Sequence, residues 1–270
     1  MIDRPLEQCL TRPGADALSL LRAAVGRTHT INAMPTPPSA AASDEASAPT
    51  VRVEVLTAVF QVRETEVGVS ELCVLLSAQA GGWRLPGGDV VPEETTEASA
   101  RRVVAERVDI GNLAHLEQLS VFSAPHRVPL VRTIASTYVG LVPSDARNTL
   151  PDAVAWHGVD ALPDLAFDHG HIVAKARQRI AAKLSYTNIA FALAPARFPM
   201  SELSEIYCAA LGYRVDATNL LRILSRRGVV VATGTLGRTG RSGGRPPALY
   251  AFADNKIRVT DEFATLRPPM

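Results

Sequence analysis

The feature that most constrains this chain is an ordered series of helix and turn signals in its C-terminal part. Ser201 is expected to cap a first helix, with Glu202 in its opening turn, and Gly212 is expected to end it. After the turn GYRV, Asp216 is expected to cap a second helix that ends at Gly228. Two short capped helices joined by a tight turn predict a helix-turn-helix. Apolar residues recur at helical spacing in both helices: Leu203, Ile206, Tyr207, Ala210 and Leu211, then Leu220, Leu221, Ile223 and Leu224.

The polar face of the second helix has the chemistry needed to read base edges. Arginine can bond guanine through two donors, asparagine can bond adenine in a similar way, and serine or threonine can reach bases or phosphates. The same residues are also consistent with an ordinary amphipathic helix that has a solvated basic face. The face consists of Thr218, Asn219, Arg222, Ser225 and Arg226.

Two short β-rich runs follow the second helix, VVVAT and ALYAF, and the glycine-rich loop GTLGRTGRSGGRPP separates them. The loop carries Arg238, Arg241 and Arg245. This order is typical of a winged helix, whose wing lies along phosphates or in a minor groove. A phosphate-binding loop is a weaker interpretation, because the pattern GxxxxGK[ST] is absent and no helix follows.

The charge distribution supports contact with nucleic acid at one end of the chain only. The formal net charge is +1, which argues against a protein that coats nucleic acid or membrane over its whole surface. However, residues 196–270 carry +5 and the preceding residues carry −4. Six arginines and no acid lie between Ala217 and Ala253, so double-stranded DNA is the expected partner of this region.

Length and composition indicate three segments. A chain of 270 residues with 47% hydrophobic residues is long enough for two domains, each with its own core. We expect a disordered or weakly ordered extension over residues 1–50, a first domain over 51–190 and a winged helix over 191–270. Asn32–Thr50 is almost entirely Ala, Pro, Ser and Thr. Residues 1–31 either form a short helix near Leu18–Val25 or precede a natural start at Met34.

Cysteine usage and hydropathy point to a soluble cytoplasmic protein. The three cysteines are an odd number without CxxC spacing, so we expect neither a disulfide framework nor a cysteine-rich zinc site. No uninterrupted apolar run approaches the ~18 residues that a membrane span needs. Acidic residues precede the apolar stretch Ala17–Val25, unlike the basic region of an export signal, so we expect no membrane partner.

The central part of the chain interleaves predicted strands and helices, so the expected fold class is α+β. β-branched residues and partial alternation predict strands at VRVEVLTAVFQV, from Val51, and at ELCVLLSAQ. Further strands are predicted at Leu116–Phe122 and Val131–Leu141. Helices are predicted at Thr95–Val108 and from about Gly170 to Leu184.

The segment Gly88–Ile110 resembles the Nudix box, in which a glycine, five residues, Glu and seven residues precede R-E-U-x-E-E-x-G-U, with U aliphatic. Three positions depart from the pattern: Val103 and Arg107 replace acids, and Asp109 replaces a glycine. Positions 103, 106 and 107 share a helix face, where a working enzyme holds divalent cations with three carboxylates. The matching residues are Gly88, Glu94, Arg102, Val104, Glu106 and Ile110, preceded by Trp83, Leu85, Pro86 and Gly87.

One carboxylate beside a guanidinium is a poor magnesium site, so hydrolysis is expected to be absent or vestigial, with no catalytic residue, metal or cofactor. Binding of an anionic pyrophosphate can survive, because the loop leads into a helix N-terminus. Alternatively, Glu94 and Arg102 pair only to fix the loop against the helix. The candidate effector-binding residues are Gly87, Gly88, Glu94, Arg101, Arg102 and Glu106.

The order of a degenerate Nudix box and a winged helix is similar to that of the Nudix-related transcriptional regulators, the NrtR family, over Val51–Phe252. The resemblance implies a Nudix-like α/β/α sandwich followed by a winged helix-turn-helix. It also implies a homodimeric bacterial repressor that binds a near-palindromic operator upstream of NAD biosynthesis or salvage genes and senses ADP-ribose or a related nucleotide. Further segments that agree are LEQLSVF, ASTYVGL, LAFDHGHI, SELSEIY and VDATNLLR.

Other functions stay open at this stage. The chain could be an ADP-ribose or dinucleotide pyrophosphatase with an accessory DNA-binding domain, or a regulator that has lost ligand sensing. His169 and His171 suggest a metal site less well than a structural loop entering a helix. Trp83, Trp156 and Phe122 could stack a base, although aromatic residues near strands more often belong to a core.

Overall fold

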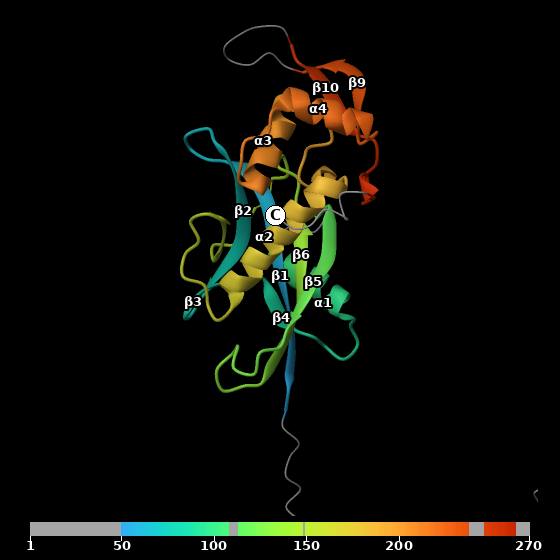
Figure 1. Ribbon diagram of the computed structural model, residues 1–270. Coiled ribbons are helices and arrows are strands. Elements are labelled where there is room, and N and C mark those ends of the chain that lie inside the picture. Colours follow the sequence, from blue (N-terminus) through green and yellow to red (C-terminus); the bar gives the residue numbers. More distant parts are fainter. Residues whose placement is uncertain (1–49, 108–112, 148, 238–245, 263–270) are drawn as a thin grey trace, which may run out of the picture. The chain divides into compact units, whose positions relative to one another are not determined.

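The computed structural model describes residues 50–107, 113–147, 149–237 and 246–262 (Figure 1). The predicted N-terminal extension therefore lies outside the described residues, apart from Thr50. The three arginines of the predicted wing, Arg238, Arg241 and Arg245, also lie outside them. Within the four described ranges, no helix is both long enough and apolar enough to cross a membrane.

The first domain is built on one mixed sheet, in which β3, β2, β1, β6 and β5 follow one another (Figure 1). In addition, β4 pairs with β1 and β7 pairs with β2. The central pair β1 and β6 is parallel, and the other pairs are antiparallel. The strands are β1 (Arg52–Glu64), β2 (Ser70–Gln79), β3 (Gly82–Arg84), β4 (Gly87–Asp89), β5 (His115–Phe122), β6 (Thr133–Leu141) and β7 (Val154–Gly158).

Helices cover both faces of this sheet. Leu56, Ala58 and Phe60 of β1 lie in the same core cluster as the apolar stripe of α2 (His169–Tyr186). Val55, on the other face of β1, packs with residues of α1 (Thr96–Ala105). Because both faces are covered, β1 is buried without interruption from Glu54 to Val62, as expected for a central strand. The expected α/β/α sandwich is confirmed.

The C-terminal part forms the expected winged helix. Two helices, α3 and α4, form the helix-turn-helix. They are accompanied by a three-stranded sheet with the strand order β8, β10, β9. Leu203, Ile206 and Leu220 are buried in the same core cluster as α2. The elements are the 3₁₀ helix η2 (Ile189–Ala192), β8 (Phe198–Pro199), α3 (Met200–Leu211), α4 (Ala217–Arg226), β9 (Val230–Leu236) and β10 (Ala248–Phe252).

Three of the four predicted helix-end signals in this region are confirmed. Gly228, with φ of +62°, directly follows Arg227, the C-terminal cap of α4. Asp216 caps α4, because its carboxylate accepts a hydrogen bond from the Asn219 amide at 2.7 Å. Gly212 ends α3 with φ of +77°, a left-handed conformation that favours glycine. The predicted cap Ser201 is wrong: α3 begins at Met200, and Pro199 is its cap. Phe198 and Pro199 pair with β10, so tertiary pairing places the cap of α3 two residues earlier than predicted.

The predicted box helix is shorter than expected. It begins at Thr96, where the Thr95 hydroxyl accepts a hydrogen bond from the Ala98 amide, and ends at Ala105 rather than Val108. Glu106 is its C-terminal cap, and residues 108–112, including Asp109 and Ile110 of the box, lie outside the described residues. Short strands β3, β4, β7 and β8 were not expected, because each is formed mainly by pairing with a distant segment.

Candidate DNA-binding and nucleotide-sensing sites

The outward face of α4 consists of the five polar residues that the sequence indicated. Thr218, Asn219, Arg222, Ser225 and Arg226 are all exposed. The opposite side of the helix is fixed in the core, where Leu220 and Leu224 are 5% and 3% exposed. Leu221 and Ile223 are only half-buried, so the buried stripe is narrower than predicted.

Hydrogen bonds organise this face. Oδ1 of Asn219 accepts a hydrogen bond from Nη2 of Arg222 at 2.7 Å, which orients the guanidinium along the helix surface. Arg227 differs from its neighbour Arg226, because its side chain is only 26% exposed and its donors are bound within the protein. Arg222 and Arg226 are therefore the two arginines of α4 that remain available to an external acceptor.

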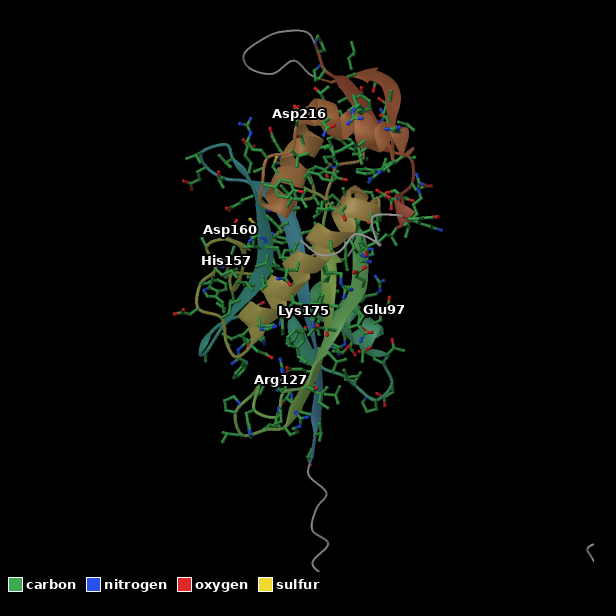
Figure 2. The ribbon with its side chains drawn as sticks, viewed as in Figure 1. Glu97, Arg127, His157, Asp160, Lys175 and Asp216 are labelled. Atoms are coloured by element: carbon green, nitrogen blue, oxygen red, sulfur yellow. The ribbon has the colours of Figure 1, made fainter. Side chains whose placement is uncertain are left out.

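The hairpin that follows α4 has the expected form. β9 and β10 are antiparallel, and β9 continues to Leu236, three residues beyond the predicted strand VVVAT. The side chain of Leu236 is exposed at the base of the loop. Figure 2 shows Asp216 at the beginning of α4, in the same C-terminal domain as this hairpin.

The segment of residues 83–89 lies between β1 and β2 and is called the wedge below. β3 pairs with β2, β4 pairs with β1, and the Thr57 amide donates to the Pro86 carbonyl at 2.8 Å. A Cβ on Gly87 would lie 2.4 Å from Cδ2 of Leu56, and a Cβ on Gly88 would lie 3.1 Å from Cγ1 of Val103. Close packing therefore requires glycine at 87 in particular.

Glu94 and Arg102 lock the loop before α1 against that helix. Nε of Arg102 donates to the Glu94 carboxylate at 3.0 Å, and its Nη2 donates to the Asp89 carbonyl at 3.2 Å. The Ser99 hydroxyl also donates to Glu94 at 2.7 Å. The hydrogen bonds from Arg102 and Ser99 lower the pKa of Glu94. These contacts agree with the alternative that Glu94 and Arg102 pair to fix the loop against the helix.

The remaining box residues do not fit a magnesium site. Val103 is 2% exposed and packs with Val55 and Tyr138, so this position faces the core. The half-exposed Glu106 lies 3.4 Å from Arg102 and 3.5 Å from Arg107, so two guanidinium groups already neutralise its charge. In the described parts of the chain, no group of three His, Cys, Asp or Glu residues is placed to hold a metal ion.

Arg101, a candidate for phosphate contact, lies on the solvent side of α1. It pairs with Glu97 one turn earlier, with Nη2 2.9 Å from Oε1. Both side chains are about half exposed, with values of 47% and 59%. A nucleotide would therefore have to compete with Glu97 for Arg101, whereas Glu94 and Glu106 are both paired with Arg102.

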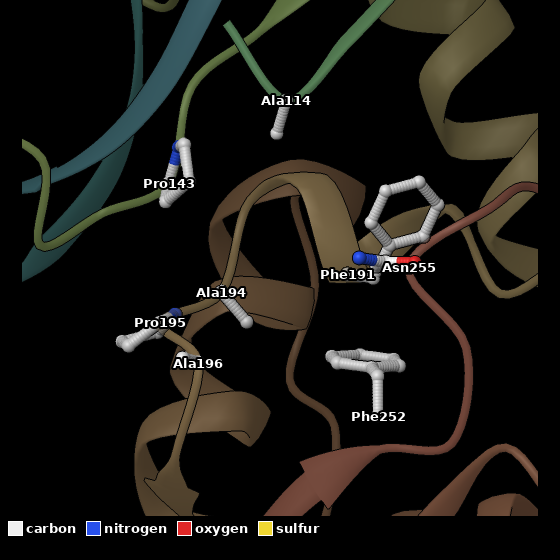
Figure 3. A pocket seen from close by; sticks show the side chains of 8 residues that line it. All are labelled: Ala114, Pro143, Phe191, Ala194, Pro195, Ala196, Phe252 and Asn255. Atoms are coloured by element: carbon white, nitrogen blue, oxygen red, sulfur yellow. The ribbon is translucent and has the colours of Figure 1, made fainter. Parts of the chain in front are cut away.

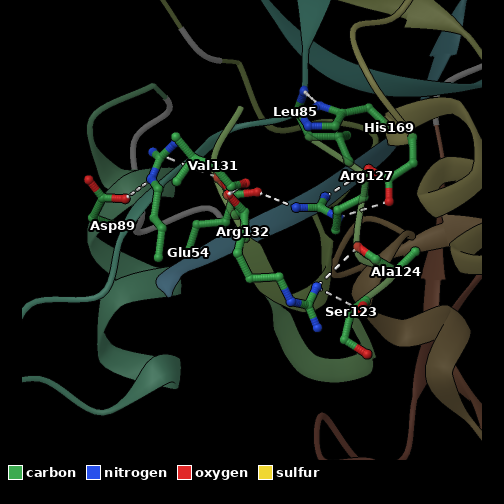
Figure 4. A network of polar contacts seen from close by, with 12 residues as sticks. Glu54, Leu85, Asp89, Ser123, Ala124, Arg127, Val131, Arg132 and His169 are labelled. Carbon is green, nitrogen blue, oxygen red and sulfur yellow. Dashed lines mark hydrogen bonds and ion pairs between the residues drawn. The ribbon is translucent and has the colours of Figure 1, made fainter. Parts of the chain in front are cut away.

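A second polar network lies beside the wedge, and the sequence did not indicate it (Figure 4). Arg127, whose side chain is 1% exposed, donates to Glu54 at 2.7 Å and to both carboxylate oxygens of Asp168 at 2.7 and 2.9 Å. Arg127 precedes β6 in a loop without any motif, and Glu54 lies within an apolar strand. In the sequence, the only sign of this network is the single acid Glu54 within the apolar strand β1.

His169 belongs to this network and does not act as a metal ligand in it. Its Nδ1 accepts a hydrogen bond from the Leu85 amide at 3.0 Å, and the residue is 3% exposed. Burial lowers the pKa of His169 to about 4, with Asp168 opposing and Arg127 and Arg84 adding to the shift. His171 instead contacts the ring of Phe122. The segment entering α2 therefore fastens the wedge to the helix.

Trp83 and Trp156, two of the aromatic residues considered for base stacking, have partners within the protein, whereas two buried hydroxyls near the wedge have none. Trp83 packs edge-on against His157, with ring centroids 4.3 Å apart, which is a core contact. The guanidinium of Arg63 lies 5.7 Å from the centroid of the Trp156 ring. Among the described residues, the buried hydroxyls of Thr57 and Ser77 have no hydrogen-bond partner in the structure.

An apolar hollow of about 390 Å³ lies near η2 and the end of β10, apart from both candidate sites (Figure 3). The side chains of Phe191 and Phe252 contribute aromatic surface to it, and Asn255 supplies an amide. None of the candidate effector residues lines it. The other lining residues are Ala114, Pro143, Ala194, Pro195 and Ala196.

Comparison with known proteins agrees with this architecture. Residues 190–252 match the NrtR DNA-binding winged helix domain. The chain is 28% identical, over 212 residues, to the ADPR responsive transcriptional repressor NtrR of Acinetobacter baylyi, and the match covers 76% of this chain and 83% of that protein.

Two solved structures show the same fold. Shewanella oneidensis NrtR, complexed with a 27mer DNA, has a TM-score of 0.61 and 24% identity and covers 74% of this chain and 93% of its own. A MutT/nudix family protein from Enterococcus faecalis has a TM-score of 0.57 and 22% identity, over 77% of this chain and 90% of its own. The arrangement of a Nudix-like domain ahead of a winged helix is thus shared with proteins of known structure.

Proposed function

We propose that this chain, an NrtR-family protein with a Nudix-like domain ahead of its winged helix, is a DNA-binding transcriptional repressor that senses ADP-ribose or a related nucleotide. The observation that carries the proposal is the outward face of α4, where Arg222 and Arg226 are exposed on a helix whose other side is fixed in the core. The match of residues 190–252 to a DNA-binding domain supports this assignment. The Acinetobacter relative is an ADPR responsive repressor by name, which supports ADP-ribose as the effector.

The proposal includes a homodimer that binds a near-palindromic operator in the cytoplasm, upstream of genes of NAD biosynthesis or salvage. A single α4 reads a few base pairs, and a two-fold dimer places a second copy on the next half-site about one DNA turn away. Arg238, Arg241 and Arg245 would add phosphate or minor-groove contacts from the wing.

We also propose that the Nudix-like domain binds its effector without hydrolysing it. Gly87, Gly88, Glu94, Arg101, Arg102 and Glu106 remain the candidate effector residues. The support is chemical: Val103 occupies a core position, and Glu106 is engaged by two guanidinium groups instead of a cation. A ligand that favours the DNA-incompetent state would then release the repressor.

The function is tested by selecting bound fragments from genomic DNA and measuring operator affinity for Arg222→Ala and Arg226→Ala. Each loss of a base contact is expected to weaken binding by roughly 1 to 3 kcal/mol, about 5- to 150-fold. Arg147→Ala is the matched control, since it removes an exposed arginine outside the winged helix. Unchanged affinity and salt dependence in both α4 variants would refute the role assigned to this helix.

Calorimetric titration with ADP-ribose and NAD tests the sensing part separately. Saturable binding of ADP-ribose that changes operator affinity supports an effector-controlled repressor. Operator binding without any nucleotide binding would instead favour a regulator that answers to a protein partner or a modification.

A further inference from the structure

Helix α2 contacts both candidate sites, one at each end. It runs from His169 to Tyr186, which corresponds to about 27 Å at 1.5 Å per residue. Figure 1 shows it lying along the sheet, with its C-terminal end near the winged helix. The two ends are bonded to segments that are far apart in the sequence.

The N-terminal end of α2 is fastened to the wedge that carries Gly87 and Gly88. The Leu85 amide donates to the ring of His169, and the Ala166 amide donates to the Trp83 carbonyl at 3.0 Å. Asp168 adds the ion pair with Arg127, which also binds Glu54 of β1. A displacement of the wedge is therefore opposed by direct contacts with this end of the helix.

The C-terminal end of α2 is fastened to the end of α4 through Arg227. Nη1 of Arg227 donates to the Ser185 carbonyl at 3.1 Å, and Nη2 donates to the Asp261 carboxylate at 2.5 Å. The segment that carries Asp261 is itself tied to α2, because the Thr260 amide donates to the Tyr186 carbonyl at 2.7 Å. Arg227 is the C-terminal cap residue of α4. One guanidinium thus joins α4, α2 and the segment after β10.

The body of α2 is closely packed in the core. One side of the helix is buried against the sheet, and none of its buried apolar side chains is more than 4% exposed. Such a helix transmits displacement from end to end instead of bending locally, because its interior contacts have little free volume. The side chains concerned are Ile172, Val173, Ala176, Ile180 and Leu184.

We propose that Arg227 is a positioning residue for DNA recognition, which sets the orientation of α4 relative to α2 and so makes operator binding depend on the wedge at Gly87 and Gly88. This inference rests on the proposed function and names the route by which the effector acts. Arg226 and Arg227 are adjacent in sequence but differ in their surroundings: Arg226 is exposed, whereas Arg227 is half-buried and bonded to Ser185 and Asp261. Arg227 is not expected to contact a base.

The experiment measures operator Kd with and without saturating ADP-ribose for the full chain, Arg227→Gln and Asp261→Asn. In the wild type, ADP-ribose is expected to change operator Kd by about tenfold or more. In both variants that ratio should fall below about threefold, while calorimetry shows an ADP-ribose Kd within about threefold of wild type. Arg147→Gln is the matched control, since Arg147 is an exposed arginine of the first domain that takes no part in the contacts of α2 described above.

The two variants distinguish a positioning role of Arg227 from a purely electrostatic effect on DNA affinity. Arg227→Gln removes a positive charge and Asp261→Asn removes a negative one, so an electrostatic role would move operator affinity in opposite directions. A positioning role lowers the response to ADP-ribose in both. A wild-type response that persists in both variants would overturn the inference and leave the proposed function intact. A wild type without any ADP-ribose response would overturn the proposed function, and the inference with it.

Discussion

At the scale of single residues, His169 shows how a motif acquires its role only from its surroundings. In the sequence it is half of an H-x-H pair beside an acid, which is compatible with a metal site or with a structural turn. In the structure, the ring is buried and its Nδ1 accepts the Leu85 amide, so the imidazole is neutral and its other nitrogen carries the proton. The three-dimensional partner, eighty-four residues earlier in the chain, decides the role.

The lowered pKa of His169 predicts a loss of stability in acid. The folded value is about 4 and the ordinary value is 6.5, so the unfolded chain binds more protons between these pH values. The free energy of unfolding should therefore fall as pH decreases from about 7 towards 4, by up to about 3 kcal/mol from this group. Denaturant unfolding at several pH values checks this.

His169→Gln should lower the free energy of unfolding at pH 7, because the hydrogen bond from Leu85 is disturbed. It should also reduce the dependence of that free energy on pH between about 7 and 4. His126→Gln is the matched control, because it removes an exposed histidine without touching the buried contact. A His169→Gln protein with the full wild-type slope would show that other groups cause the acid sensitivity.

At the scale of elements, α1 retains the shape of a Nudix helix but not its metal-binding chemistry. The loop before it is fixed by Glu94 and Arg102, and the helix packs on β1 and β6 through Val103. Its sequence spacing located the element, although the helix ends at Ala105 rather than at the predicted Val108. The start of α3 also differs from the prediction, because Phe198 and Pro199 pair with β10.

The composition of α1 predicts that the protein does not turn over ADP-ribose. Incubation with ADP-ribose and Mg²⁺ or Mn²⁺ should release no AMP above the protein-free rate, because Glu106 alone cannot assemble the oxygen ligands that such a cation requires. Chromatographic quantification of AMP checks this. Steady AMP release that disappears in Glu106→Gln would revive the pyrophosphatase interpretation.

At the scale of the whole molecule, reading a near-palindrome requires two copies of α4 in fixed spacing. Light scattering should give about twice the chain mass of 28.8 kDa for the free protein. Insertion of about 5 base pairs between the two half-sites should weaken binding at least tenfold, since it turns one half-site by half a DNA turn. DNA with the same insertion outside the half-sites is the control. Equal affinity for both DNAs would contradict dimeric recognition.

Local signals in the sequence were sufficient for the elements whose stability is local. The cap at Asp216, the stop at Gly212 and the outward face of α4 follow from capping and helical spacing, which act within one or two turns. The Nudix-like spacing around Gly88 and the replacement of two acids by Val103 and Arg107 can also be read from the sequence, whereas the pairing of β3 with β2 and of β4 with β1 was not predicted. The predicted functions of these residues in binding remain predictions.

The tertiary structure decided everything that depends on contacts between distant segments. The burial of Arg127 between Glu54 and Asp168, the bond from Leu85 to His169 and the commitment of Arg227 to Ser185 each join parts of the chain separated by dozens of residues. An arginine that is proposed to read DNA and one that joins two helices have the same local sequence signature. Only the position of the acceptor distinguishes them, because a guanidinium bonds whichever oxygen the fold brings within reach.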